Sequence, residues 1–340
     1  MNKILHLLDK DFALHYLRDN VLPLYPIFKE ITHVNIKPYK KMVWETTYHV
    51  VIGFDVYFLD ASDQEIKVPI VCSAHSDEPR ENVFSALKYL WSKNLNGQGV
   101  DLPRPLFYSE EFNGTFYRAI KGENLLYYIK NKDLVAVEKI VFETAELFAK
   151  LHAIPAGVEA NFNPINSRIR TVIPGVNMIL QEMKTRYGDK YYPTLKKIYS
   201  YFVIEEEKFF ASGEPLKLIH GDAHPENIIK TSEDRIGVID FTDLCLSDFA
   251  RDLGAFLQQL EYKIVSKIGD VEFAEKMKEL FLHSYLTAAG LELTSDLQER
   301  INLYYDWTAI RTATYWFLKF GHNEERAGKL LEVVKNKMNL

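Results

Sequence analysis

The pattern of apolar residues changes near residue 120, and this change constrains the fold of the 340-residue chain more than any other feature. Before it, the segments HVVIGFDVYFLD and EIKVPIVCSA are rich in β-branched and aromatic residues, which is typical of strands. A further strand is expected near ITHVNIK, so residues 31–74 should form an antiparallel meander. A helix over DEPRENVFSALKYLWSK and a hairpin that turns at Asn113–Gly114 are expected to follow.

After residue 120 the pattern is helical. Apolar residues recur mostly at three- and four-residue steps, which predicts helices over residues 133–152, 249–266, 271–288 and 297–320. Only one further pair of strands is evident, LKLIH and IGVID, and a polar segment lies between them. We therefore predict that this polar segment is carried by a short hairpin-like insert among the helices.

Together these patterns predict an α+β fold with two lobes. Residues 1–30 are amphipathic and are expected to form a helical extension. Residues 31–120 are expected to form a small β-rich lobe with one helix, and residues 121–340 a larger helical lobe. A chain of this length can bury two such cores.

The charge and composition of the chain argue against some classes of binding partner. The formal net charge is −6, whereas a dedicated nucleic-acid binder usually carries a basic excess, so we expect no nucleic-acid partner. No stretch of about 18 apolar residues occurs, so no membrane span is expected. The chain has only 2 cysteines, and its first residues lack the uninterrupted apolar core of a signal peptide, which favours a cytoplasmic location. The sequence does not indicate an oligomeric state.

The polar segment KLIHGDAHPENIIK spans residues 217–230. His220 and His224 are four residues apart, and on a helix this spacing would suggest a zinc site. Gly221 and Pro225 interrupt the segment, however, and no third ligand stands at a known spacing. We therefore favour an irregular loop over a metal-binding helix.

Pairing of the two flanking strands would bring three polar side chains to one end of the hairpin, namely Asp222, Asn227 and Asp240. An amide oxygen and a carboxylate suit Mg²⁺, and a second carboxylate can orient a hydroxyl group that attacks a phosphorus atom. The alternative is that these side chains only satisfy backbone groups in a turn. That alternative accounts for one such residue easily and for three at this spacing poorly.

The same residues resemble those of a known family. His220, Asp222 and Asn227 reproduce the kinase spacing His-x-Asp-x-x-x-x-Asn, and Asp240–Phe241 stands where kinases have Asp-Phe-Gly. The form HGDAHPEN…VIDF resembles the aminoglycoside phosphotransferase and choline kinase group, which are small-molecule kinases with a two-lobed, protein-kinase-like fold. The resemblance covers roughly residues 30–320.

This resemblance implies a phosphotransferase that moves the γ-phosphate of ATP or GTP to a hydroxyl group of a small molecule. It implies that Asp222 is the catalytic base and that Asn227 and Asp240 hold Mg²⁺. His220 and Asp252 would support the catalytic loop without reacting. No phosphate-dependent activation switch is expected, because Gly221 stands where protein kinases have an arginine.

The resemblance fails at the nucleotide site. The family has a lysine on the third strand and a glutamate partner in the next helix, but here the aligned position is Ser73, or else Cys72. Glu81 is the candidate partner acid. Cations elsewhere could bind the nucleotide instead. The candidates are Lys40 and Lys41 between the first two strands, and then Lys67, Arg80, Arg118 and Lys121, of which Lys67 is a poor substitute and Arg118 a better one. The alternative function is a pseudokinase, a binding module that has lost catalysis.

The acceptor site is expected in the helical lobe. The segment NLYYDWTAIRTATYWFLKF contains Tyr304, Asp306 and Trp307, and aromatic faces with a carboxylate favour a cationic acceptor. Asp243 is expected to add negative charge near the catalytic loop. The alternative for the aromatic residues is a structural role in the core. The run of three glutamates at 205–207 is expected to be a solvated helix face.

Overall fold

The computed structural model describes residues 2–97, 99–319 and 323–338. The chain forms two compact units. The first unit contains Met1–Gly122 together with Thr231–Thr242, and the second contains Glu123–Lys230 and Asp243–Leu340. The sequence had grouped all residues after 120 in one lobe, but the segment 231–242 belongs to the first unit.

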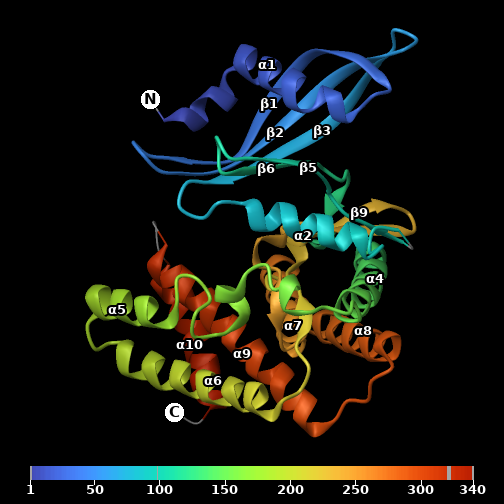
Figure 1. The fold of residues 1–340 in the computed structure, drawn as a ribbon. Coiled ribbons are helices and arrows are strands. Elements are labelled where there is room, and N and C mark those ends of the chain that lie inside the picture. Colours follow the sequence, from blue (N-terminus) through green and yellow to red (C-terminus); the bar gives the residue numbers. More distant parts are fainter. Residues whose placement is uncertain (1, 98, 320–322, 339–340) are drawn as a thin grey trace. The chain divides into compact units, whose positions relative to one another are not determined.

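The first unit is built on a five-stranded antiparallel sheet with the order β1-β2-β3-β6-β5 (Figure 1). The expected meander and the expected hairpin are both present. The strands are β1 (Phe28–Val43), β2 (Tyr48–Asp60), β3 (Glu65–His75), β5 (Arg104–Ser109) and β6 (Gly114–Arg118).

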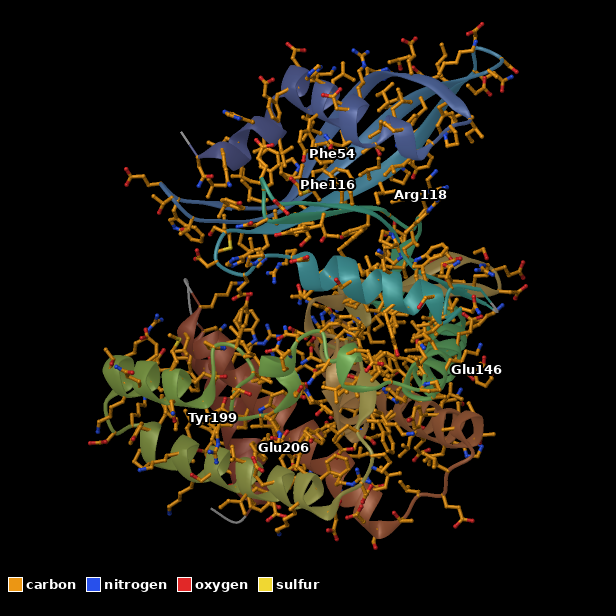
Figure 2. The ribbon with its side chains drawn as sticks, in the orientation of Figure 1. Phe54, Phe116, Arg118, Glu146, Tyr199 and Glu206 are labelled. Carbon is orange, nitrogen blue, oxygen red and sulfur yellow. The ribbon has the colours of Figure 1, made fainter. Side chains whose placement is uncertain are left out.

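Helical segments at the N-terminus cover one face of this sheet (Figure 1). They are η1 (Lys3–Leu8), α1 (Lys10–Asn20) and η2 (Leu22–Leu24). The side chain of Asp9 caps α1 by accepting a hydrogen bond from the backbone N–H of Phe12 at 2.9 Å. Alternate residues along β2 and β6 face the helices, and Phe54 and Phe116 belong to this core (Figure 2).

The other elements of the first unit are short. Helix α2 (Glu81–Ser92) packs against β5 and β6. Strand β4 (Val100–Asp101) pairs in parallel with β10 (Arg235–Val238), with Ile236 opposite Val100. This pairing joins the segment 231–242 to the rest of the first unit.

The second unit is mostly helical, and the four helices that the sequence predicted are all present. Helix α7 packs against α8 and α9, α4 packs against α8, and α10 packs against α9. The unit also contains helices α3, α5 and α6. Residue 320 of the predicted helix 297–320 lies outside the described residues. The helices are α3 (Leu125–Lys130), α4 (Leu134–His152), α5 (Val176–Tyr187), α6 (Tyr192–Ser212), α7 (Ala250–Ile268), α8 (Val271–Ala289), α9 (Ser295–Leu318) and α10 (Glu324–Lys337).

The strand pairing around the polar segment differs from the prediction. Strand β8 (Lys217–Ile219) does not pair with β10; it pairs with β11 (Cys245–Ser247), and Ile219 lies opposite Cys245. An additional strand, β9 (Ile228–Ser232), follows Asn227 and pairs with β7 (Glu123–Asn124). These strands are only two to five residues long. An alternation of apolar and polar residues cannot be recognised over so few positions, so the sequence did not reveal these strands.

Among the described residues, no helix has both the length and the apolar character that crossing a membrane requires.

Candidate active site

The loop after β8 carries the predicted catalytic residue, and a glycine fixes its path. Gly221 has a φ of +81°, which favours glycine. A Cβ atom at this position would lie 2.3 Å from the backbone oxygen of Asp243. Any larger residue would therefore displace the loop or the segment that leads into β11.

Asp252, in the first turn of α7, anchors this loop. Its carboxylate accepts the backbone N–H of His220 at 2.7 Å and that of Gly221 at 2.9 Å. His152 Nε2 lies 3.1 Å from the same carboxylate, and Asp252 is fully buried. Burial raises the pKa of Asp252, but the hydrogen bond and charge of His152 outweigh burial and lower the pKa. An ionised carboxylate thus ties the loop to α7, as the supporting role of Asp252 and His220 would require.

Arg251 is a second anchor, which sequence analysis missed. Its guanidinium is fully buried, donates to the backbone oxygen of Gly221 at 3.1 Å, and also donates to the backbone oxygen of Asn166. The guanidinium lies 5.1 Å from the ring centroid of Trp307. The only sign of this role in the sequence was that Arg251 directly precedes Asp252, the acid predicted to support the loop.

Asp222 and Asn227 are held together by the loop and by the short helix η5 (Pro225–Asn227). Asn227 Nδ2 donates to the backbone oxygen of Asp222 at 3.0 Å. This bond orients the Asn227 amide, and within the described residues its Oδ1 atom accepts no hydrogen bond. The side chain of Asp222 is 38% exposed. The loop therefore offers an open carboxylate and an available amide oxygen, two groups suited to a hydroxyl donor and a hard cation.

Charged neighbours keep the Asp222 carboxylate ionised. Burial raises the pKa of Asp222, but His224 at 3.4 Å, with the positive charge of Arg311, outweighs burial and holds the pKa well below its usual value. Burial lowers the pKa of His224, but Asp222 and Glu226 raise it to about 10. His224 therefore acts as a cation beside Asp222, and the sequence had suggested it only as a zinc ligand.

Asp240 belongs to the first unit and has an unusual backbone conformation. Its φ of +65° lies in the left-handed region, which non-glycine residues rarely adopt outside functional or tightly held segments. Thr242 Oγ1 donates to Asp240 Oδ1 at 2.8 Å. Asn82 Nδ2 donates to the backbone oxygen of Thr242 at 3.1 Å, which ties this segment to α2.

The sheet of the first unit shows how the missing lysine can be replaced. In the strand register, Lys40 is opposite Val51, Val51 is opposite Ser73, and Ser73 is opposite Thr115. These four residues form one row across the sheet, on the face opposite the N-terminal helices. Lys40 lies two strands from Ser73, about 10 Å away between backbones. A lysine therefore occupies the same row and face as the expected position.

The surroundings of Lys40 are rich in cationic and titratable groups. Its Nζ atom lies 3.1 Å from His49 Nε2. Burial and the charge of Arg80 lower the pKa of Lys40, and the carboxylate of Asp240 opposes them. Arg80 is 5% exposed, and its Nε atom has no hydrogen-bond partner within the described residues. A buried cation with an unused donor is suited to bind an anion.

Three other candidates for the nucleotide site lie elsewhere. Lys41 is opposite Val50 and Arg118 is opposite Ile70, and both partners face the N-terminal helices. The alternation of side chains therefore places Lys41 and Arg118 on the opposite face of the sheet from Ser73. Glu81 is exposed and forms no ion pair with a residue that the structure describes, so it is not the partner of Lys40.

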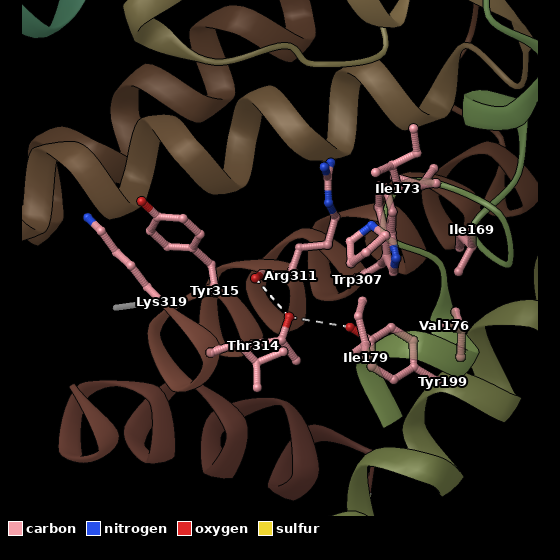
Figure 3. A pocket seen from close by; sticks show the side chains of 13 residues that line it. Ile169, Ile173, Val176, Ile179, Tyr199, Trp307, Arg311, Thr314, Tyr315 and Lys319 are labelled. Atoms are coloured by element: carbon pink, nitrogen blue, oxygen red, sulfur yellow. Dashed lines mark hydrogen bonds between the residues drawn. The ribbon is translucent and has the colours of Figure 1, made fainter. Parts of the chain in front are cut away.

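Two pockets of the second unit share lining residues, and Asp222 lines one of them. The first has a volume of about 290 Å³, and its lining includes Gly221, Asp222, His224, Thr312 and Trp316. The second has a volume of about 340 Å³ and is mostly apolar (Figure 3). Arg311 and Tyr315 line both pockets. The pocket lined by Asp222 therefore borders the apolar pocket at Arg311 and Tyr315.

The predicted acceptor residues are separated by the structure. Trp307 lines the apolar pocket. Tyr304 is fully buried and donates to Glu206 at 3.3 Å, so its assignment to the acceptor site is wrong. Asp306 pairs with Lys337 at 2.9 Å and lines a different pocket from Trp307, so the structure does not bring these two predicted residues together. Asp243 lies against Gly221 and accepts a hydrogen bond from Asn166 Nδ2.

In the described ranges, no group of three His, Cys, Asp or Glu side chains is arranged to hold a metal ion. The predicted Mg²⁺ ligands, Asn227 and Asp240, include an amide and would supply few protein oxygens. Mg²⁺ commonly binds in this way, because it keeps several waters and takes further oxygens from substrate phosphates. The residue types therefore fit a metal that arrives with a nucleotide.

Comparison with known protein families shows to which family the chain is similar. Residues 52–292 match the model of the phosphotransferase enzyme family. No curated protein matches the chain.

Several solved structures share the fold. An ethanolamine kinase of Plasmodium vivax has a TM-score of 0.58 and 18% sequence identity, over 98% of this chain and 88% of that one. A choline/ethanolamine kinase family protein from Mesorhizobium loti has a TM-score of 0.57 and 13% identity, over 97% and 95%. The complex of APH(2")-IIa with streptomycin and ATP has a TM-score of 0.53 and 16% identity, over 95% of each chain. The α+β, kinase-like fold expected from the sequence is thereby confirmed.

Proposed function

Because the chain belongs to the phosphotransferase enzyme family, we propose that it transfers the γ-phosphate of a nucleoside triphosphate, ATP or GTP, to a hydroxyl group of a small molecule. The observation that carries the proposal is the loop of Asp222 and Asn227. This loop presents an open carboxylate and an available amide oxygen, and Asp252 and Arg251 hold it rigidly. Rigid positioning of such groups is most of what phosphoryl transfer asks of a protein.

Each residue of the proposed site has one role. Asp222 accepts a hydrogen bond from the acceptor hydroxyl, orients it toward the phosphorus, and takes its proton as the new bond forms. His220 and Asp252 keep the loop in place. Asn227 and Asp240 are the proposed ligands of Mg²⁺. When bound, the ion would neutralise charge on the phosphates.

The nucleotide phosphates require a cation, and we assign this role to Lys40 and Arg80. Lys40 shares its row and face of the sheet with Ser73, and Arg80 is buried with an unused donor. Burial lowers the pKa of His49 and His75 and favours their neutral forms, so the positive charge of this cluster comes from Lys40 and Arg80. The cluster is thus suited to a polyanion.

The first experiment measures transfer of phosphate from ATP and from GTP to a panel of alcohols. Asp222→Asn should lower the rate by roughly 10²–10⁴-fold, because a general base contributes about that much. Asp19→Asn, an exposed aspartate of α1, is the matched control and should keep full activity. Transfer that survives Asp222→Asn unchanged would refute the assignment of the base.

The absent third-strand lysine also favours a second candidate, a pseudokinase. The two candidate functions differ in whether a phosphorylated product forms. A nucleotide that binds the folded state raises the melting temperature, so a titration with Mg²⁺–ATP and Mg²⁺–GTP is a direct screen. Absence of any shift would favour the pseudokinase. A shift without phosphorylated product over the whole panel would indicate a nucleotide-binding module.

A further inference from the structure

The apolar pocket of the second unit has an unusual balance of charge. Its lining is largely aliphatic and aromatic, with the charged side chains of Arg311 and Lys319 (Figure 3). No carboxylate is among the described residues that line it. The Arg311 guanidinium forms no hydrogen bond or ion pair with the residues that the structure describes, although it lies 4.9 Å from the ring centroid of Trp307. Arg311, whose positive charge also acts on the Asp222 carboxylate, therefore lines both the apolar pocket and the Asp222 pocket without a hydrogen-bond partner for its guanidinium among the described residues.

The aromatic rings near this junction are already in contact with cations of the protein. Trp307 contacts Arg311 and Arg251, Tyr315 contacts Lys319, and Trp316 contacts Lys319 and Arg326. An aromatic site for a cationic ligand works because open ring faces attract the ligand's charge. Here cationic side chains of the protein already contact these rings, so the rings do not form a binding site for an ammonium group.

We propose that the acceptor is an apolar alcohol that carries an anionic group, with its hydroxyl at Asp222, its anion at Arg311 and its apolar body in the pocket lined by Trp307. The position of the hydroxyl rests on the proposed function, whereas the charge and the apolar character rest on the pocket alone. The pocket volume of about 340 Å³ suits a small organic molecule. Amines such as ethanolamine and polycations such as streptomycin would be repelled by Arg311 and Lys319.

The reaction balances without a further reactant. The acceptor oxygen forms a bond to the γ-phosphorus as the bond from that phosphorus to the bridging oxygen of the nucleotide breaks. The hydroxyl proton passes to Asp222, and the products are a phosphate monoester and a nucleoside diphosphate. A carboxylate on the acceptor takes no part in this step and serves only for recognition.

A matched series of ligands tests the charge of the acceptor directly. The probes are 3-hydroxyoctanoate, 3-hydroxyoctanamide and 1-amino-3-octanol, which share an apolar tail and differ in the charge of the group next to the hydroxyl end. Calorimetric titration of the full chain without nucleotide should give the tightest binding for the anion and the weakest for the amine. A hydrogen bond to a charged group contributes about 1.5–3 kcal/mol, so removing the anionic charge should weaken binding roughly 10- to 100-fold.

Variants of the protein test the role of Arg311. Arg311→Gln should weaken binding of 3-hydroxyoctanoate by the same factor and leave binding of the neutral amide unchanged. Lys329→Gln removes an exposed positive charge from α10, lines neither pocket, and is the matched control. Unchanged binding of the amide shows that Arg311→Gln is folded. Equal or tighter binding of the amine, or failure of the anion to bind, would overturn the proposal.

The two proposals fail in different ways. Preferential binding of the anion with no phosphorylated product, with ATP or GTP, would keep the pocket assignment and reject the phosphotransferase. Phosphorylation of 1-amino-3-octanol in preference to 3-hydroxyoctanoate would keep the phosphotransferase and reject the anionic acceptor.

Discussion

At the scale of single residues, a buried carboxylate in α6 couples folding of the second unit to pH. Glu206 is 1% exposed and accepts the backbone N–H of Ile169 at 2.8 Å and the hydroxyl of Tyr304 at 3.3 Å. Burial raises its pKa to about 7, although these hydrogen bonds and the charge of Arg251 oppose the change. The run of glutamates at 205–207 is therefore not a uniformly solvated face.

This pKa predicts how stability depends on pH. Between pH 4.5 and 7 the unfolded chain loses the Glu206 proton while the folded chain keeps it, so the free energy of unfolding falls as pH rises. Relative to Glu206→Gln, the unaltered protein should lose about 2–3 kcal/mol between pH 5 and pH 8. Urea unfolding of both proteins at the two pH values measures this difference. Parallel pH profiles would show that Glu206 is already ionised at pH 5.

Lys40 and Lys41 are neighbours in sequence and lie on opposite faces of the sheet, so they form a matched pair. Lys40→Met should weaken binding of Mg²⁺–ADP about 10- to 100-fold, because it removes a charge-assisted hydrogen bond to phosphate. Lys41→Met should leave the affinity within about twofold, since its side chain faces the N-terminal helices. Calorimetric titration gives both dissociation constants. Equal weakening by the two substitutions would argue against a specific role for Lys40.

At the scale of elements, the catalytic loop depends on α7. Asp252→Asn should lower the free energy of unfolding by about 3 kcal/mol or more, because a neutral amide cannot accept both backbone N–H groups and also face His152. Asp19→Asn changes an exposed acid of α1 and should change stability by less than about 1 kcal/mol. Urea unfolding distinguishes the two variants. Similar stability of both would contradict the anchoring role of Asp252.

The elements also show where sequence analysis succeeds. The strands β1 to β3 and the long helices α4, α7, α8 and α9 were predicted because each repeats its apolar period several times. Strands β8, β9 and β11 have three to five residues, so their pairing depends on contacts distant in sequence. Arg251 and Glu206 were missed because nothing local distinguishes a buried charged residue of a helix from a solvated one.

At the scale of the whole molecule, the motif from His220 to Asp240 allowed the family to be recognised, because its spacing reflects the chemistry of phosphoryl transfer. The nucleotide site could not be predicted in the same way. The row from Lys40 to Ser73 joins residues 33 positions apart, and only strand register brings them together. The charge balance of the pocket lined by Trp307 could not be predicted either, since only the fold brings Arg251 and Arg311 to this ring.

The most direct test is a crystal structure of the protein with Mg²⁺ and a non-hydrolysable ATP analogue. The account predicts one ion bonded to Asn227 Oδ1 and to the Asp240 carboxylate at roughly 2.0–2.1 Å, with Lys40 or Arg80 on the phosphates. It also predicts that the Asp222 carboxylate faces the γ-phosphate without binding the ion. An ion that contacts neither Asn227 nor Asp240, or an Asp222 carboxylate turned away from the phosphate, would contradict the proposed function.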